Sequence, residues 1–147
     1  MIRPAVPADR AAVEAIVRDA YAVYLDRMDR PPGPMLDDYG ALIAEGAVSV
    51  LDEYGAIRAI LVLLARPDHL LLDNVAVRPD SQGMGLGRRL IAFAENEARR
   101  LGHAELRLYT HVTMVENVAL YARLGFVETG RGREHGYDRV FMTKRLD

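Results

Sequence analysis

The residues best suited to chemistry form a glycine-rich turn at Gly83, Gly85 and Gly87, which follows an apolar segment at residues 75–77. Glycine lets the backbone approach a ligand closely, and a helix that begins at such a turn offers unpaired N–H groups and the positive end of its dipole. This combination favours pyrophosphate binding. The alternative is that the glycines only permit a tight turn and close helix packing. Three basic residues flank the turn and favour the anion site: Arg78, Arg88 and Arg89.

The spacing of the glycines excludes two common nucleotide motifs. A Walker loop requires a lysine followed by serine or threonine, and this turn has no lysine. The dinucleotide fingerprint Gly-x-Gly-x-x-Gly also fails, because its third glycine would fall on Arg88 or on Leu90. Neither of these two nucleotide motifs therefore accounts for the turn.

The elements that must position this turn are predicted from hydrophobic periodicity. Apolar residues at three- and four-residue spacing predict a helix from near Asp9 to Tyr24, and residues 36–45 form a second, shorter helix. Strands are expected at 47–51, 57–65 and 70–77. The middle strand is apolar on both faces, as in a central strand covered by helices on each side.

The second half of the chain alternates between strand and helix. Helices are expected at 85–101, where Gly102 supplies the stop, and at 113–124; strands are expected at 106–109, 126–129 and 139–144. Residues 30–34 contain three prolines and form a loop. The order predicts an α/β (α+β) fold, with a mixed, mostly antiparallel sheet of six or seven strands and four flanking helices, in one domain over residues 1–147.

Composition excludes several classes of protein. The chain has 147 residues, a formal net charge of -2 and no cysteine, so disulfides, thiolate zinc sites and a cysteine nucleophile are excluded. The absence of a basic excess argues against nucleic acid as a partner. No apolar run reaches the roughly 20 residues of a membrane span, which makes the cytoplasm the expected location. The four histidines show no metal-ligand spacing, so no bound metal is expected.

Two motifs resemble the GNAT superfamily of acyl-CoA-dependent N-acetyltransferases. The first is Gln82-x-x-Gly85-x-Gly87, which fits the family motif Arg/Gln-x-x-Gly-x-Gly/Ala after a strand. The second is the segment 116–128, which looks like the Leu-Tyr-x-x-x-Gly-Phe segment at the end of the family's core. The expected order of elements also matches the family over essentially the whole chain, although the N-terminal third matches in outline only.

The resemblance implies acetyl-CoA as the co-substrate. An extended strand can pair with the amide-bearing pantetheine arm, and an N–H group near its end can polarise the thioester carbonyl. In this chain the strand residues are Val75, Ala76 and Val77. The backbone N–H groups that would hold the pyrophosphate belong to Gln82, Gly83, Met84, Gly85, Leu86, Gly87 and Arg88.

The resemblance also implies catalytic roles for particular side chains. Tyr121 would deliver a proton to the sulfur of departing coenzyme A, since a phenol is protonated at neutral pH; the alternative is a half-buried helix tyrosine. Asp73 is the candidate base, because strand alternation places it on the same face as Val75 and Val77; the alternative is a solvent-facing or hydrogen-bonded polar residue. His111 or water could serve instead. Asn117 would contact pantetheine or help to start its helix, although the commoner family position for this asparagine is occupied by Met114.

The expected reaction is direct attack by a primary amine of a small molecule or peptide on acetyl-CoA. The acceptor would be selected by the N-terminal part: Tyr21, Tyr24, Asp26, Arg27 and the 31–34 loop. Two alternatives are a non-catalytic acyl-CoA-binding regulatory module and another nucleotide-binding protein. An edge strand near the C-terminus could pair across a homodimer.

Overall fold

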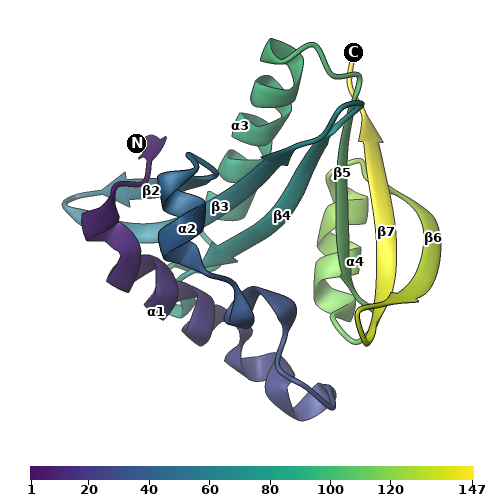
Figure 1. Ribbon diagram of the computed structural model, residues 1–147, viewed down its shortest axis with the longest axis horizontal. Coiled ribbons are helices and arrows are strands. Elements are labelled where there is room, and N and C mark those ends of the chain that lie inside the picture. The colour runs from purple at the N-terminus through teal and green to yellow at the C-terminus, as the bar shows by residue number, and fades with distance from the viewer. The chain divides into compact units, whose positions relative to one another are not determined.

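The computed structural model describes all 147 residues, which form a seven-stranded sheet and four α-helices joined by turns and 3-10 segments (Figure 1). The strand order is β1-β2-β3-β4-β5-β7-β6. β4 and β5 pair in parallel, whereas β2 pairs antiparallel with β1 and β3, and β7 with β5 and β6. The mixed, mostly antiparallel α/β fold predicted from the sequence is thus confirmed. The chain divides into two compact units, Met1–Leu63 with Asn74–Ala92 and Leu64–Asp73 with Phe93–Asp147.

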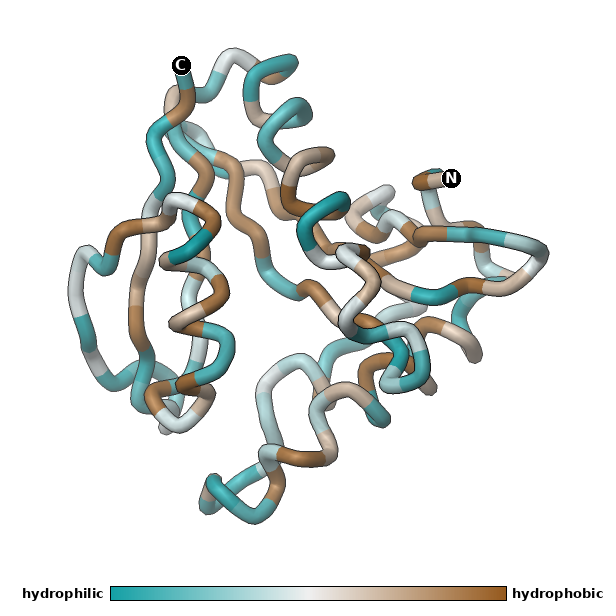
Figure 2. Tube along the Cα trace, turned by 180° about the vertical axis from the view of Figure 1, so that it is seen from behind, coloured by the Kyte–Doolittle hydropathy of each residue, from teal (hydrophilic) through white to brown (hydrophobic).

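The first unit contains the N-terminal strands β1 (Ile2–Pro4) and β2 (Val48–Glu53) and most of β3 (Ala56–Ala65). The turn between β2 and β3 has positive φ at Tyr54 and Gly55, as a two-residue hairpin with the right-handed strand twist requires. The apolar run of β3 is a continuous hydrophobic stretch of the trace (Figure 2). Its four residues from 59 to 62 are fully buried, which confirms a strand covered on both faces.

Of the two N-terminal helices, α2 begins at a side-chain capping contact, whereas α1 does not. α1 (Arg10–Tyr21) follows a 3-10 turn at Pro7–Asp9 and buries the apolar face that its periodicity predicts. α2 (Tyr39–Ala44) is shorter than the predicted 36–45 helix. Its start is set by Asp38, whose side chain accepts a hydrogen bond from the Ala41 N–H at 3.1 Å. The residues before it form a separate 3-10 turn at Gly33–Leu36.

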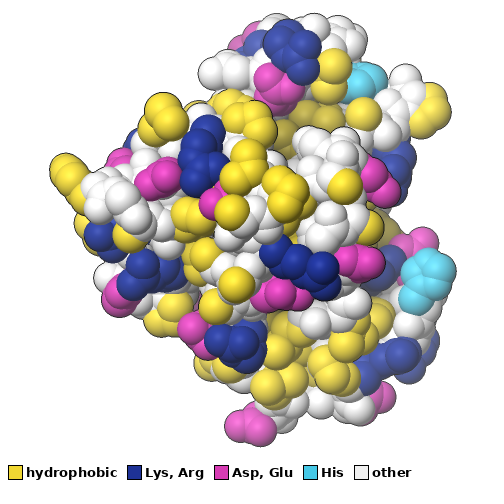
Figure 3. All heavy atoms as spheres, turned by 60° about the vertical axis from the view of Figure 1, so that its left-hand side comes forward, with side chains coloured by type: hydrophobic (Ala, Val, Ile, Leu, Met, Phe, Trp, Pro, Cys, Tyr) yellow, Lys and Arg dark blue, Asp and Glu magenta, His cyan; other side chains and the backbone are white.

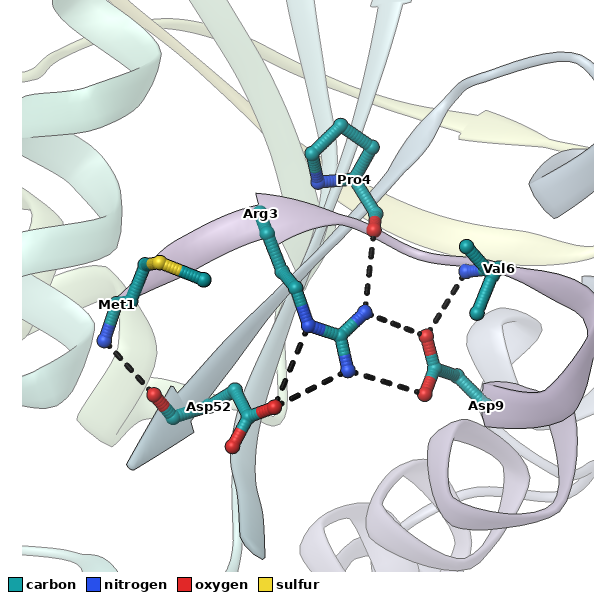
Figure 4. Close-up of polar contacts among 6 residues, drawn as sticks. All are labelled: Met1, Arg3, Pro4, Val6, Asp9 and Asp52. Atoms are coloured by element: carbon teal, nitrogen blue, oxygen red, sulfur yellow. Dashed lines mark hydrogen bonds and ion pairs between the residues drawn. The ribbon is translucent and has the colours of Figure 1, made fainter. Parts of the chain in front are cut away.

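Arg3 joins three elements of the first unit (Figure 4). Its guanidinium donates to both carboxylate oxygens of Asp9, at 2.8 and 3.2 Å, and to Asp52 on β2. The Val6 N–H also donates to Asp9, at 2.8 Å. These contacts hold the pKa of the Asp9 carboxyl below its usual value, chiefly through the Arg3 hydrogen bond. The cluster fixes β1, a strand too short for its alternation to be recognised in the sequence.

β4 (Leu70–Val77) and α3 (Leu86–Arg100) lead into and out of the glycine-rich turn. Burial alternates along β4, so that residues 71, 73, 75 and 77 share the less buried face. α3 ends at Gly102, whose φ of 79° lies in the left-handed region, and this confirms the predicted stop. The turn is therefore held between a regular strand and a regular helix.

The second unit contains β5 (Glu105–His111), α4 (Val115–Arg123), β6 (Val127–Glu134) and β7 (Tyr137–Arg145). The terminal strands are longer than predicted and form a hairpin whose turn has positive φ at His135 and Gly136. β6 is an exposed edge strand rich in glycine and charge, so its sequence carries little strand pattern. In β5 and β7, even-numbered residues are largely buried and odd-numbered residues lie on a more open face.

No helix in the protein is both long enough and apolar enough to cross a membrane. The space-filling view shows basic and acidic side chains interspersed on the face that it draws (Figure 3). The net charge of -2 agrees with this mixture of the two signs.

Candidate active site

The glycine-rich turn has open space beside its backbone. Gly83 and Gly85 have φ angles of 80° and 79°, which favour glycine, whereas Gly87 lies within the first turn of α3. A Cβ atom built on any of the three would meet no atom within 4 Å. Close packing inside the protein therefore does not explain these glycines, and a ligand can approach the backbone here.

The start of α3 supplies the donors for such a ligand. The Arg89 N–H donates to the Gly85 carbonyl oxygen at 3.1 Å, which is the first hydrogen bond of the helix. The N–H groups of residues 86–88 precede that bond and have no acceptor within the helix. Open space and unpaired donors at a helix start fit a pyrophosphate group.

The three flanking arginines differ in their contacts. Arg78 is paired with Asp80 at 2.6 Å, and Arg89 is paired with Glu53 on β2. Arg88 is exposed beside the turn. Two of the three guanidinium groups predicted to support the anion are thus already paired with carboxylates, which leaves the backbone N–H groups and Arg88 as the donors available for an anion.

The turn is joined to the end of β4 by a side-chain contact. Gln82 Nε2 donates to the Val77 carbonyl oxygen at 3.3 Å. Met84, within the turn, is 62% exposed, and Leu86, the first residue of α3, is buried. Val75 and Val77 share one face of β4, while Ala76 is buried on the other. The predicted cofactor residues at positions 75–77 and 82–88 therefore lie on one short stretch of the chain, whereas Asn117 lies on α4.

Asn74 is a buried polar residue that the sequence reasoning missed. Its Oδ1 accepts from the Tyr21 hydroxyl at 2.7 Å, and its Nδ2 donates to the Tyr39 hydroxyl at 3.0 Å. The Tyr39 hydroxyl in turn donates to the carbonyl oxygen of Pro34 in the proline-rich loop. The signal in the sequence that could have identified Asn74 is its polar side chain within an otherwise largely apolar strand. The network ties β4 to α1, to α2 and to the loop predicted to select the acceptor.

The N-terminal tyrosines are more buried than their predicted role requires. Tyr21 and Tyr24 are 7% and 8% exposed, with ring centroids 6.1 Å apart. The guanidinium of Arg27 lies over the Tyr24 ring, 5.1 Å from its centroid. Core packing therefore accounts for both rings, and Asp26 and Arg27 are the exposed residues of this set.

Asp73 lies on the open face of β4 and accepts a hydrogen bond from Tyr109, a residue of the same compact unit. The Tyr109 hydroxyl donates to Asp73 Oδ1 at 3.2 Å. Burial raises the pKa of the Asp73 carboxyl above its ordinary value, and the Tyr109 hydrogen bond with the charges of Arg66 and Arg139 opposes that rise. A carboxylate with a raised pKa is suited to accept a proton from an amine. Tyr109 was not among the predicted site residues.

Tyr121 and Asn117 both lie on α4. The Tyr121 ring is buried and packs edge-on against Phe126, with centroids 5.7 Å apart. Asn117 is half-buried, and its Nδ2 lies 3.8 Å from the sulfur of Met114. Met114, at the commoner family position for the asparagine, is itself buried at the start of α4.

His111, the alternative base, is hydrogen-bonded to Thr113 just after β5. Its Nδ1 accepts from the Thr113 N–H at 3.2 Å and lies 2.8 Å from the Thr113 hydroxyl oxygen. With Nδ1 accepting, a neutral ring carries its proton on Nε2, which is then a donor. No group of three or more histidine, aspartate or glutamate side chains is placed to hold a metal ion.

A cavity of about 870 Å³ lies on the open sheet face of the second unit. The residues that line it include Leu71, Tyr109 and Phe141, together with Arg107 and Thr143. The ring of Tyr109 thus lines the cavity while its hydroxyl binds Asp73. This volume is typical of small-molecule sites.

Comparisons with known proteins agree with this geometry. The model of the acetyltransferase (GNAT) family matches residues 10–126. The "IAA acetyltransferase" of Azospirillum brasilense is 31% identical over 111 residues, covering 73% of this chain and 63% of its own length. The ribosomal protein bS18 alanine N-acetyltransferase of Escherichia coli K12 is 36% identical over 78 residues, covering 53% of each chain. The chain thus spans less than two thirds of the length of these curated relatives.

Solved structures give the same fold. The crystal structure of the Escherichia coli ribosomal-protein-S18-alanine N-acetyltransferase has a TM-score of 0.79 at 25% identity, covering 99% of this chain and 93% of its own. A Salmonella typhimurium structure with its cofactor acetyl-CoA has a TM-score of 0.73 at 26% identity, covering 100% and 94%. A Thermoplasma acidophilum N-acetyltransferase in complex with coenzyme A has a TM-score of 0.83 at 15% identity, covering 99% and 98%, which shows the fold alone.

Proposed function

Because this chain belongs to the GNAT family of acetyltransferases, we propose that it transfers an acetyl group from acetyl-CoA to a primary amine of a small molecule or peptide. The observation that carries the proposal is the open glycine-rich turn between β4 and α3, where donors and space meet at a helix start. Relatives named as acetyltransferases and a similar structure with its cofactor acetyl-CoA support it. The proposed acetyltransferase domain is residues 1–147, and the family match draws on both compact units.

The residues proposed to hold acetyl-CoA fall in two groups. Backbone groups of Val75, Ala76 and Val77 bind the acyl group and pantetheine, with Asn117 as a further contact. Backbone N–H groups bind the pyrophosphate, assisted by the exposed guanidinium of Arg88. These belong to Gln82, Gly83, Met84, Gly85, Leu86, Gly87 and Arg88.

The proposed chemistry uses one base and one acid. Acetyl-CoA supplies an acetyl thioester, which an amine can attack directly, and the chain has no cysteine to carry a covalent acyl group. Asp73 accepts the proton that the ammonium group must lose before attack. Tyr121 gives a proton to the departing thiolate. A backbone N–H near Val77 polarises the carbonyl oxygen as negative charge develops on it.

The cavity on the open sheet face is the proposed site for the body of the acceptor. It adjoins Asp73 through Tyr109, so an amine at Asp73 could extend over Leu71 and Phe141. This assignment moves part of the acceptor site from the N-terminal tyrosines, whose rings are buried, to the β5–β7 surface.

Thermal unfolding with separate ligands tests the proposal first. Acetyl-CoA or coenzyme A at a hundred times its dissociation constant adds about 2.7 kcal/mol, which raises the midpoint by roughly 5 to 10 °C. ATP and NAD at the same concentration should give no shift. Release of coenzyme A is then measured with a panel of amines and peptides. A shift with ATP or NAD but not with coenzyme A would overturn the proposal, and binding without release for any amine would indicate a non-catalytic acyl-CoA-binding module.

A further inference from the structure

We infer that Tyr109 is a positioning residue whose hydroxyl orients the Asp73 carboxylate for the acceptor amine. The inference rests on the proposed function, since it takes Asp73 as the base. It begins from the register of the sheet, in which Leu71 of β4 pairs with Arg107 of β5. Two residues further along, Asp73 and Tyr109 project from the same face, and the hydroxyl lies 3.2 Å from Oδ1.

The Tyr109 ring is itself held by two neighbours on β7. The guanidinium of Arg139 lies over the ring, 4.0 Å from its centroid, and forms an ion pair with Glu134 at 2.8 Å. Phe141, which pairs with Tyr109 in the register, has its ring centroid 6.4 Å away. A cation–π contact and an aromatic neighbour restrict the ring to one orientation. The hydroxyl is therefore directed at Asp73 before any substrate binds.

A donor at this position acts on the charged form of the carboxyl group. Burial favours neutral Asp73, and a hydrogen bond to the carboxylate favours the ionised form that can accept a proton. The remaining charges that bear on this pair come from the neighbouring elements. They are Arg66 after β3 and Arg139 on β7.

The change Tyr109→Phe removes the donor and keeps the ring. We expect the pH at which kcat/KM rises to move upward, with a roughly three- to tenfold loss near pH 6 that narrows at higher pH. The matched control is Tyr54→Phe, the same chemical change at a turn residue that is 95% exposed. Its pH profile should coincide with that of the unchanged protein.

Carboxyl ¹³C NMR titration gives a readout that needs no acceptor. The Asp73 signal is assigned by its loss in Asp73→Asn, and it should titrate at higher pH in Tyr109→Phe than in the unchanged protein. An unchanged titration in a folded Tyr109→Phe protein would overturn the inference. A uniform loss of kcat at every pH would also overturn it, because Tyr109 would then take part in the reaction directly. If Asp73→Asn keeps full activity, the assignment of the base fails even where the titration shift is found.

Discussion

Gly87 offers a way to separate stability from ligand binding at the glycine-rich turn. It lies in the first turn of α3, its φ is outside the left-handed region, and a Cβ atom there would meet no neighbour within 4 Å. Nothing in the protein itself therefore requires glycine at this position. Two variants follow from this: Gly87→Ala adds a small side chain, and Gly87→Leu adds one that fills the space beside the N–H groups.

The expected effects have opposite signs for stability and for binding. Glycine in a helix interior is about 0.8 to 1.0 kcal/mol less favourable than alanine, and near a helix start about half of that is retained. Both variants should therefore raise the midpoint of the protein without ligand by about 2 °C. Gly87→Ala should keep the shift given by coenzyme A. Gly87→Leu should reduce that shift, roughly 5 to 10 °C in the unchanged protein, to below about 2 °C.

Thermal unfolding with and without coenzyme A, together with calorimetric titration, measures both effects in the same samples. Because Gly87→Leu is expected to be more stable than the unchanged protein, loss of binding could not be ascribed to misfolding. Full retention of the shift in Gly87→Leu would refute the placement of the pyrophosphate at this helix start. A fall of several degrees in both variants without ligand would refute the conclusion that the space beside Gly87 is open.

Three further changes test other parts of the protein. Tyr121→Phe should lower kcat roughly 10- to 100-fold while coenzyme A binds within twofold of its original affinity; equal kcat would remove Tyr121 as the acid. Asn117→Ala should weaken coenzyme A binding several-fold without lowering the midpoint, as titration calorimetry would show. Asp9→Asn should cost about 1.5 kcal/mol, or about 4 to 6 °C, at pH 7. Because Arg3 lowers the pKa of Asp9, this stability is present above the unfolded pKa of about 3.9 and is lost as pH falls toward the folded value. The midpoint difference between Asp9→Asn and the unchanged protein should therefore be smaller at pH 3 than at pH 7.

Regular elements with a strong apolar pattern could be predicted from the sequence. The central strand β3 and the helices α1 and α3 have the predicted type and nearly the predicted bounds, because their burial repeats at the period of the element. β1 and β6 could not be predicted in full. β1 is three residues long and is fixed by the Arg3 cluster, and β6 is an exposed edge strand whose pairing with β7 sets its length.

The candidate site, too, was predictable from the sequence only in part. Backbone roles follow from glycine spacing, so the turn at residues 82–88 was predictable. Side-chain roles depend on pairing between strands, which the sequence does not specify. The contact between Asp73 and Tyr109 follows from the parallel register of β4 and β5, and the Asn74 network follows from the packing of two tyrosines against β4.

The departure from the family pattern on α4 has a physical basis in the packing around Met114. Its side chain is 4% exposed at the start of the helix, where its sulfur accepts from the Thr110 hydroxyl at 3.4 Å, so this position is occupied by a buried thioether. Asn117 lies almost one turn further along, and the acceptor of its amide is that same sulfur at 3.8 Å. A thioether is a weak acceptor, so the amide gives up little if it turns to a better partner. An amide donor is thus retained on α4 three residues after the usual position, and this is why we assign pantetheine contact to Asn117 and not to a residue at the position of Met114.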